Sequence, residues 1–394
     1  MLKISPPIGA TLIIAGTTIG AGMLALPIIS HGLGFGLMAF LMILTWGFMG
    51  IAALFTLEAN LAIKPGCSLF VMATETLGNT GRLVAVSAMI FLFYALMAAY
   101  ISAGGEQMGN DLTTLLPDSF STQIELAHRL GIALFTLFFG AIAVAGVQYI
   151  DLGNRLLFIF MLGAFCVALS FLAPEAQPYK LHTFPANPWQ SVMILPVIFT
   201  SFGYHGNIPS LIAYVGPNKK QLQRIFLLGS LIPLLLYLIW LGVALGQLDN
   251  TTLAKVSTSG SVPELIDALS RGSTSYLLPA LHIFTNLALI TSFLGVALGL
   301  FDFMHSALAS QSRLKTALVV YLPPLAIAIL LPGAFVIALS YAALALAVLA
   351  ILLPAAMLYQ LHKQNKIPRY PGRYLFWPTL AFGIAICLLS LVFS

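Results

Sequence analysis

Charged residues are scarce in this sequence. Of its 394 residues, 7% are Asp, Glu, Lys or Arg, whereas 60% are hydrophobic. An average soluble domain contains about 25% charged residues, so the composition excludes a soluble globular protein and indicates an integral membrane protein. Long polar connections are lacking as well, and the longest runs from about Asp249 to Tyr276. We therefore expect one transmembrane domain over residues 1–394, with no soluble domain attached.

Cysteine is equally rare. The three cysteines, Cys67, Cys166 and Cys387, are far apart in the sequence, and such spacing indicates neither a disulfide framework nor a metal site. The G-x-S-x-G elbow of hydrolases, the H-E-x-x-H zinc motif and a nucleotide-binding loop are absent too. We expect no cofactor, no bound metal and no enzymatic activity.

Long hydrophobic runs are abundant. A helix needs about 20 apolar residues to cross a hydrocarbon core of about 30 Å, and eleven runs have the required character. We therefore predict an all-α polytopic membrane protein with eleven transmembrane helices. The runs lie at about 8–30, 36–62, 83–110, 126–147, 153–173, 190–214, 224–247, 277–308, 315–331, 333–360 and 374–394.

Basic residues fall mostly in alternate connections. With the N-terminus in the cytoplasm, the outer side carries only Arg129, Lys180, Lys255 and Arg271. Positive charge of this asymmetry is a topology signal, so the formal charge of +5 does not indicate a nucleic-acid partner. We expect a cytoplasmic N-terminus and a periplasmic C-terminus. The inner side then carries the other thirteen: Lys3, Lys64, Arg82, Arg155, Lys219, Lys220, Arg224, Arg313, Lys315, Lys363, Lys366, Arg369 and Arg373.

Helix-breaking residues interrupt two of the eleven runs. The first run contains "GTTIGAGMLALP" (16–27), and the sixth contains "FTSFGYHGNIPS" (199–210). Irregular backbone at membrane depth persists only where it is buried in protein or lines a cavity. Each break opens a block of five runs, and because five is odd, the second block enters the membrane in the opposite sense. Matching breaks in two inverted halves point to a transporter binding site.

The same pattern gives the expected organisation of the chain. A first repeat covers about 8–173, a second repeat covers about 190–360, and an extra helix covers 374–394.

The glycine spacing has a second interpretation. "GTTIG" is also a G-x-x-x-G pattern, which lets two membrane helices pack closely, and this spacing recurs at 32–36, 242–246 and 295–299. Polar side chains accompany both breaks, whereas a packing face needs few of them. They favour an unwound binding site over a packing face, and they are Thr17, Thr18, Ser201, Tyr204, His205 and Asn207.

An unwound turn suits a small zwitterion. The half-helix after the break points its N-terminal amides and the positive end of its dipole at a carboxylate, and glycine lets the backbone approach the ligand. Gly20, Ala21 and Gly22 are expected to offer N–H groups to the carboxylate. Freed carbonyl groups before the break are expected to bind the ammonium group, and those residues are Ala15, Gly16 and Thr17.

Ionisable groups at membrane depth are few, and each is a functional hypothesis because an isolated charge there costs about 2.5–3.5 kcal/mol or more. His205 at the second break can change charge near neutral pH, or it can cap freed backbone groups as a neutral imidazole. Glu106 follows "SAGG", where glycines let another helix approach; it is either a proton carrier or an outer-interface residue. We interpret Glu58 and Asp302 as cytoplasmic anchors and His282 as a hydrogen-bonded packing residue.

Six longer segments between about Ile8 and Gln360 are distinctive: "AGTTIGAGMLALP", "YALMAAYIS", "DLGNRLLF", "PVIFTSFGYHGNIPSLIAY", "GSLIPLLLYLIW" and "ITSFLGVALGLFDF". They resemble the aromatic amino acid permeases of the amino acid–polyamine–organocation superfamily, and within this family the bacterial tyrosine-specific permeases. Thr18 and the "MLALP" that ends the first break favour tyrosine over tryptophan. The resemblance implies a leucine-transporter-like fold of two inverted five-helix repeats with broken helices 1 and 6. It also implies proton-coupled import of tyrosine across a bacterial inner membrane.

The resemblance further implies ligand-facing residues on spans one, three, six and eight. With the first break included, the substrate-binding candidates are Thr17, Thr18, Gly20, Ala21, Gly22, Tyr94, Met97, Tyr100, Ser201, Phe202, Gly203, Tyr204, His205 and Asn286. A Thr-Ser pair helps to hold the ion in sodium-coupled members of the fold. Thr291 and Ser292 are therefore ion candidates beside the proton candidates His205 and Glu106, and the driving ion stays open.

Other functions compete with this one. They are a general aromatic or tryptophan permease, a sodium-coupled carrier, and an amino-acid sensor that does not transport. A channel would need a continuous polar path or rings of charge, whereas the polar residues here gather at two breaks. The expected partners are L-tyrosine, a coupling proton and the lipid bilayer, and we expect a monomer.

Overall fold

The computed structural model of the chain describes residues 5–115, 124–145, 147–182, 188–272, 276–307, 312–331, 333–367 and 374–392. Within these ranges every regular element is a helix and no strand occurs, which confirms the all-helical class. The basic residues Lys3, Arg369 and Arg373 of the predicted topology signal lie outside the described residues, as does the side chain of Arg155.

The helices follow the hydrophobic runs of the sequence. The first half contains α1 (Pro6–Thr18), α2 (Ala21–Ile28), α3 (Gly34–Ile63), α4 (Leu69–Leu115), α6 (Ile124–Ala145) and α7 (Val147–Leu172). Short 3₁₀ turns at Ala173–Glu175 and Pro178–Leu181 follow α7. The second half begins with α8 (Pro188–Met193), α9 (Leu195–Ser201), a 3₁₀ turn (His205–Asn207), α10 (Ile208–Val215), α11 (Lys219–Gln247), α12 (Asn250–Ser259) and α13 (Val262–Ser270). It continues with α14 (Leu277–Ala307), α15 (Arg313–Leu330), α16 (Ala334–Ala347), a π-helical turn (Val348–Leu352), α17 (Leu353–Lys363) and α18 (Phe376–Val392).

Eight helices in the described part of the chain are long and apolar enough to cross a membrane, and the bent pair α1 and α2 makes a ninth span. These spans define a multi-pass membrane protein. The predicted count of eleven includes the sixth run, which is divided among the short helices α8, α9 and α10, and the last run, whose helix α18 has 17 residues. Eleven spans and the leucine-transporter-like arrangement therefore stay predictions.

Two further irregularities were not expected from the sequence. The helix α4 kinks at Gly78, where the positive φ of 67° favours glycine, so the predicted span 83–110 lies in its second part. The tenth predicted span changes to a π-helical turn between α16 and α17. In addition, the connection from Asp249 to Tyr276 contains the two helices α12 and α13.

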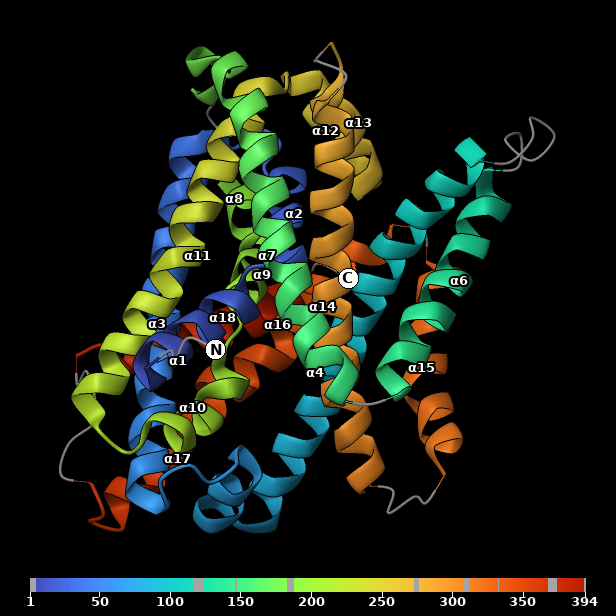
Figure 1. Cartoon of the computed structure of the whole chain (residues 1–394). Helices are drawn as coiled ribbons and strands as arrows, with labels where there is room; N and C mark the ends of the chain where they lie inside the picture. The colour runs from blue at the N-terminus through green and yellow to red at the C-terminus, as the bar shows by residue number, and fades with distance from the viewer. Residues whose placement is uncertain are drawn as a thin grey trace.

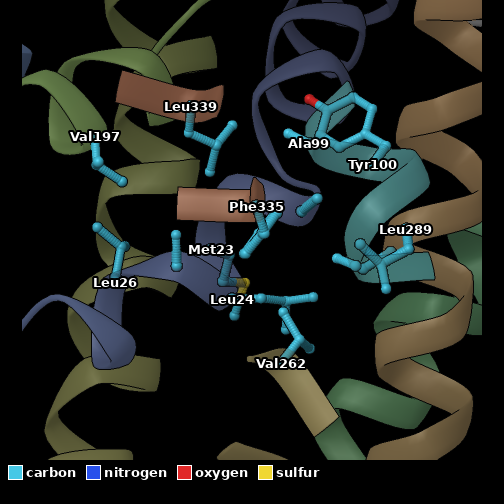
Figure 2. Packing of buried hydrophobic residues seen from close by; sticks show 14 of the residues in the cluster. Met23, Leu24, Leu26, Ala99, Tyr100, Val197, Val262, Leu289, Phe335 and Leu339 are labelled. Carbon is cyan, nitrogen blue, oxygen red and sulfur yellow. The ribbon is translucent and has the colours of Figure 1, made fainter. Parts of the chain in front are cut away.

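The half-helix α2 lies in the buried centre of the molecule. Met23, Leu24 and Leu26 on it are 1%, 0% and 0% exposed. Figure 2 shows these side chains surrounded by labelled residues of α4, α9, α13, α14 and α16. Figure 1 shows α6 and α15 at one edge of the molecule, away from α1, α10 and α17. The first break is thus held at the centre of the fold.

Glycine allows α4 and α6 to pack closely. A Cβ atom at Gly104 would come within 2.5 Å of the Phe135 ring, and one at Gly109 within 2.8 Å of His128 Cα. Gly131 of α6 faces the backbone of Gly105 and Gly109. These contacts confirm that the glycines preceding Glu106 let another helix approach.

Candidate substrate site at the two helix breaks

The first break is a two-residue interruption. Helix α1 ends at Thr18, helix α2 begins at Ala21, and the two axes differ by 45°. Gly20 has a φ of 179°, which is extended backbone that any residue adopts, so the need for glycine is one of space. A Cβ atom at Gly20 would overlap Ser292 Oγ, and one at Gly22 would lie 3.0 Å from Ser201 Oγ. The glycines therefore let α14 and α9 approach the break.

The amide groups at the start of α2 lie at this break. The Ala21 N–H donates to Ser292 Oγ at 3.1 Å. Among the described residues, the N–H groups of Gly20 and Gly22 have no hydrogen-bond partner. Two unpaired donors and the positive end of the helix dipole thus lie together, which is the electrostatic setting for an anion such as a carboxylate.

The carbonyl groups that α1 leaves free are shifted by one residue from the prediction. Ala15 O accepts a hydrogen bond from Ile19 N–H at 2.8 Å, so the expectation that Ala15 is available was wrong. The i to i−4 hydrogen bonds of α1 continue to the N–H group of Ile19, one residue further than we expected from the spacing of the glycines. Thr18 O instead lies 2.6 Å from the hydroxyl of Tyr237 on α11.

The same hydroxyl joins the first break to the second. Tyr237 Oη lies 3.0 Å from Ser201 O, at the end of α9. Ser201 Oγ donates to Val197 O at 2.9 Å and lies 3.3 Å from Gly22 O. The two breaks, about 180 residues apart in the sequence, therefore meet through backbone carbonyls, one serine and one tyrosine.

The two threonines of the first break lie on different sides of α1. Thr18 is buried, and its hydroxyl donates to Ile14 O at 2.8 Å. Thr17 is exposed, and its hydroxyl donates to Ile13 O at 2.9 Å. Both hydroxyl groups donate to carbonyl groups of their own helix. Of the two residues, Thr18 is the one connected to the second break, because its backbone carbonyl shares the Tyr237 hydroxyl with Ser201 O.

The second break is longer than the first. It runs from Phe202 through Gly203 and Tyr204 to the 3₁₀ turn that leads into α10. Phe202, Tyr204 and His205 are all buried, and the Phe202 ring lies 5.5 Å from the Tyr237 ring between centroids. A Cβ atom at Gly203 would lie 3.0 Å from the Leu346 side chain on α16. This break therefore contributes packed side chains as well as backbone groups.

His205 contacts α3. Its Nε2 lies 2.9 Å from Met49 O, and because a carbonyl only accepts hydrogen bonds, the proton is assigned to Nε2. Its Nδ1 is buried and has no partner within the described part of the chain. The imidazole thus donates to a carbonyl group inside the continuous helix α3, whereas one of its two interpretations expected it to cap backbone groups freed by the broken helix. The free Nδ1 leaves a place for a proton.

The span-three candidates separate into two groups. Met97 and Tyr100 are 0% and 9% exposed and belong to the core that contains α2, and Figure 2 shows Tyr100 beside that core. Tyr94 instead donates to Val319 O of α15 at 2.8 Å. Met97 and Tyr100 are therefore members of the buried core, whereas Tyr94 lies at the contact between α4 and α15.

The span-eight candidates also differ from one another. Ser292 is at the first break, whereas Thr291 donates to Leu287 O of its own helix at 2.8 Å. Asn286 is partly buried, and its side chain has no hydrogen-bond partner among the described residues. Only Ser292 of these three touches a break directly.

Glu106 forms no hydrogen bond with either break in the described part of the chain, and its partners lie on α4 and just before α16. It is 8% exposed, and its Oε1 accepts from Ser102 Oγ at 3.3 Å and from Gly333 N–H at 3.2 Å, just before α16. His282 Nδ1 lies 2.7 Å from Gln107 Nε2, which confirms its interpretation as a hydrogen-bonded residue. Glu106 is therefore a buried carboxylate at the junction of α4 and α16.

Tyr237 and Trp240 are the site residues that sequence reasoning missed. Trp240 Nε1 donates to Met23 O at 3.1 Å, and both aromatic residues are 0% exposed. One signal was available, because a Tyr and a Trp three residues apart in the middle of a membrane run need partners for their polar atoms. Broken helices are the nearest source of unpaired carbonyl groups.

A multi-pass membrane protein whose two interrupted segments meet at a buried polar centre is a membrane transport protein by class. A profile of the tryptophan/tyrosine permease family matches residues 3–390. The chain belongs to this family and is therefore a transport permease, not an enzyme.

Individual relatives agree with this assignment. The chain is 36% identical to tyrosine-specific transport system 1 of Haemophilus influenzae over 365 residues, covering 91% of this chain and 89% of that one. It is 32% identical to tyrosine-specific transport system 2 of the same organism, with coverage of 99% and 97%. It is 34% identical to the tryptophan-specific transport protein of Pseudomonas aeruginosa, with coverage of 96% and 92%. Similarity thus extends to both tyrosine and tryptophan permeases.

Proposed function

We propose that the protein imports tyrosine across a bacterial inner membrane by proton symport, with alternating access to a site at the two helix breaks. The observation that carries the proposal is the meeting of Thr18 O and Ser201 O at Tyr237 Oη, 2.6 and 3.0 Å away. Backbone groups freed by two breaks in the membrane interior recognise an amino acid whatever its side chain, since every amino acid has the same ammonium and carboxylate groups.

The arrangement of the chain in the membrane is part of this proposal. Eleven spans form two inverted five-helix repeats, about 8–173 and 190–360, followed by an extra helix at 374–394. The first break lies in the opening span of the first repeat and the second in the opening span of the second. The N-terminus is then cytoplasmic and the C-terminus periplasmic, and the carrier acts as a monomer.

The breaks divide the substrate between them. The unpaired N–H groups of Gly20 and Gly22 bind the carboxylate, and Thr18 O and Ser201 O bind the ammonium group. The aromatic ring of the substrate extends toward Met97 and Tyr100 of α4 and toward Phe202, Tyr204 and His205 of the second break; Asn286 remains a candidate partner for its phenol.

Competition experiments test the choice of substrate. Uptake of labelled tyrosine into proteoliposomes is measured with unlabelled tyrosine, phenylalanine or tryptophan added. A site that binds the phenol hydroxyl rejects an analogue without it by roughly 10⁴-fold or more, because its own buried polar groups are left unpaired. Equal competition by all three would indicate a general aromatic carrier with an apolar pocket. Binding without any uptake would indicate a sensor.

The coupling ion needs a separate test. His205 Nδ1, and Glu106 at its buried junction, are the groups proposed to take the proton. Uptake into sodium-free proteoliposomes is expected to follow an imposed pH gradient and to collapse when an uncoupler is added. Sodium coupling is the second candidate, favoured by the position of Ser292 at the first break. A strict sodium requirement would establish it and would make Thr291 and Ser292 the ion ligands.

A further inference from the structure

The hydroxyl of Tyr237 faces more acceptors than it can satisfy. It lies 2.6 Å from Thr18 O and 3.0 Å from Ser201 O. A phenol has one proton to donate, and carbonyl oxygens only accept. At any moment one of the two carbonyl groups is therefore without a donor from Tyr237, in a segment where water is scarce and an unpaired polar group costs several kcal/mol.

The surroundings of Tyr237 place its hydroxyl at the two carbonyl groups. The Tyr237 side chain is 0% exposed, and its ring packs against Phe202. One helical turn along α11, Trp240 Nε1 is bonded to Met23 O of α2. The α11 helix is therefore attached to α1 and α2 at the first break and to α9 at the second.

An ammonium group matches these acceptors better than a hydroxyl does. It has three N–H donors, so it can satisfy Thr18 O and Ser201 O at once. Its hydrogen bonds are charge-assisted and about twice as strong as neutral ones. The two carbonyl groups thus have a stronger partner available than the one they hold.

We infer that Tyr237 competes with the substrate for the ammonium subsite: its hydroxyl occupies the place of the substrate ammonium group in the free protein and is displaced when the ammonium binds. The inference rests on the proposed function, since it concerns the same site. Its consequence is that the hydroxyl weakens the binding of ligands that carry an ammonium group, because they must displace it. A ligand without an ammonium group leaves the hydroxyl in place and gains nothing from these carbonyl groups.

Removing the hydroxyl tests the inference. The ligands are tyrosine and 3-(4-hydroxyphenyl)propionate, which keeps the carboxylate and the phenol but has no ammonium group. In the variant Tyr237→Phe, tyrosine no longer has to break a hydrogen bond, and the analogue is unaffected. The ratio of the dissociation constant of the analogue to that of tyrosine is expected to rise by about three- to ten-fold, the range of one neutral hydrogen bond.

A matched control is present in the same chain. The hydroxyl of Tyr94 also donates to a backbone carbonyl, Val319 O at 2.8 Å, but at the contact between α4 and α15. The variant Tyr94→Phe loses the same chemical group and is expected to leave the ratio unchanged.

A second change keeps the test valid if Tyr237→Phe does not fold. Replacing Tyr237 by 3-fluorotyrosine keeps the hydroxyl and makes it a stronger donor, so tyrosine competes against a stronger bond and the ratio is expected to fall. If the ratio of the two dissociation constants changes in neither protein, the Tyr237 hydroxyl only holds the two helix breaks together. If the ratio falls in Tyr237→Phe, the phenol oxygen is a direct ligand of the ammonium group. Both results overturn the inference. If the unmodified protein binds neither compound, the proposed function fails and the inference fails with it.

Discussion

The same glycine spacing has two different structural outcomes in this molecule. Gly16 and Gly20 are four residues apart, and helix α1 ends between them, at Thr18. Gly105 and Gly109 have the same separation, yet α4 continues through both without interruption. One pair marks a bend of 45° between two half-helices, and the other marks a helix that packs closely on its neighbour.

The neighbours of each pair explain the difference. Gly131 of α6 faces the backbone of Gly105 and Gly109, so the small residues of the second pair serve close packing. At the first pair, Ser292 and Tyr237 supply hydrogen-bond partners to Ala21 N–H and Thr18 O. A helix can break inside a membrane only where such partners replace its own hydrogen bonds. Glycine permits both outcomes, and polar groups from other helices decide between them.

The largest expected effect comes from the packed pair. In Gly131→Leu the new Cβ would collide with the backbone of Gly105 and Gly109, and backbone atoms cannot rotate away. We expect a loss of about 3 kcal/mol or more of stability, seen as loss of monodisperse protein in size-exclusion chromatography after mild heating. The control is Gly295→Leu, because a Cβ there meets nothing within 4 Å. A stable, monodisperse Gly131→Leu protein would contradict the packing role.

The next effect comes from the first break. Gly20→Leu and Gly22→Leu place a side chain against Ser292 and Ser201, at the two residues whose N–H groups are unpaired in the described part of the chain. We expect binding of tyrosine to weaken by about 100-fold or more, which corresponds to losing two hydrogen bonds to a charged group, while the protein stays folded and extractable. Gly163→Leu on α7, where a Cβ has open space, serves as the control. Normal affinity in both variants would exclude a carboxylate site here.

A smaller effect tests the contact between Gly20 and Ser292. In Gly20→Ala the added Cβ meets Ser292 Oγ, and we expect roughly ten-fold weaker binding from a repulsion of about 1.4 kcal/mol. Adding Ser292→Ala removes the obstructing oxygen and should restore part of the affinity. Isothermal titration of the two single variants and the double variant decides the point. If the double variant loses more binding free energy than the two single variants together, the Ser292 hydroxyl matters more than the space that it occupies.

The smallest effect concerns the start of α2. Ser292→Ala removes the acceptor of Ala21 N–H, as the loss of a helix N-cap does, and such losses cost about 1 kcal/mol. We expect a measurably lower melting temperature. Thr291→Ala is the comparison, because its hydroxyl donates only within its own helix and its removal should cost less. Equal losses in the two variants would mean that Ser292 does not support the break.

Sequence reasoning located both breaks but not everything that meets at them. Glycine and proline in otherwise apolar runs located them, and the polar side chains beside both breaks favoured an unwound segment over a packing face. The side chains were harder to place. Thr17 and Thr18 are neighbours, yet one is exposed and the other buried, since successive residues of a helix point roughly 100° apart. Tyr94 and Tyr100 were equal candidates, and only their contacts separated them.

By itself the sequence determined that the chain is a multi-pass helical membrane protein with two interrupted segments. Hydrophobic run length and helix-breaking residues are local properties, and the membrane turns them directly into structure because backbone groups must be satisfied within each span. The tertiary structure alone decided that Tyr237, Trp240 and Ser292 form hydrogen bonds with backbone groups at the breaks. It also decided that α4 continues without a break at Gly105 and Gly109. These outcomes depend on which helix approaches which carbonyl group or amide, and a partner more than 200 residues away, as Ser292 is from Ala21, leaves no mark in the local pattern.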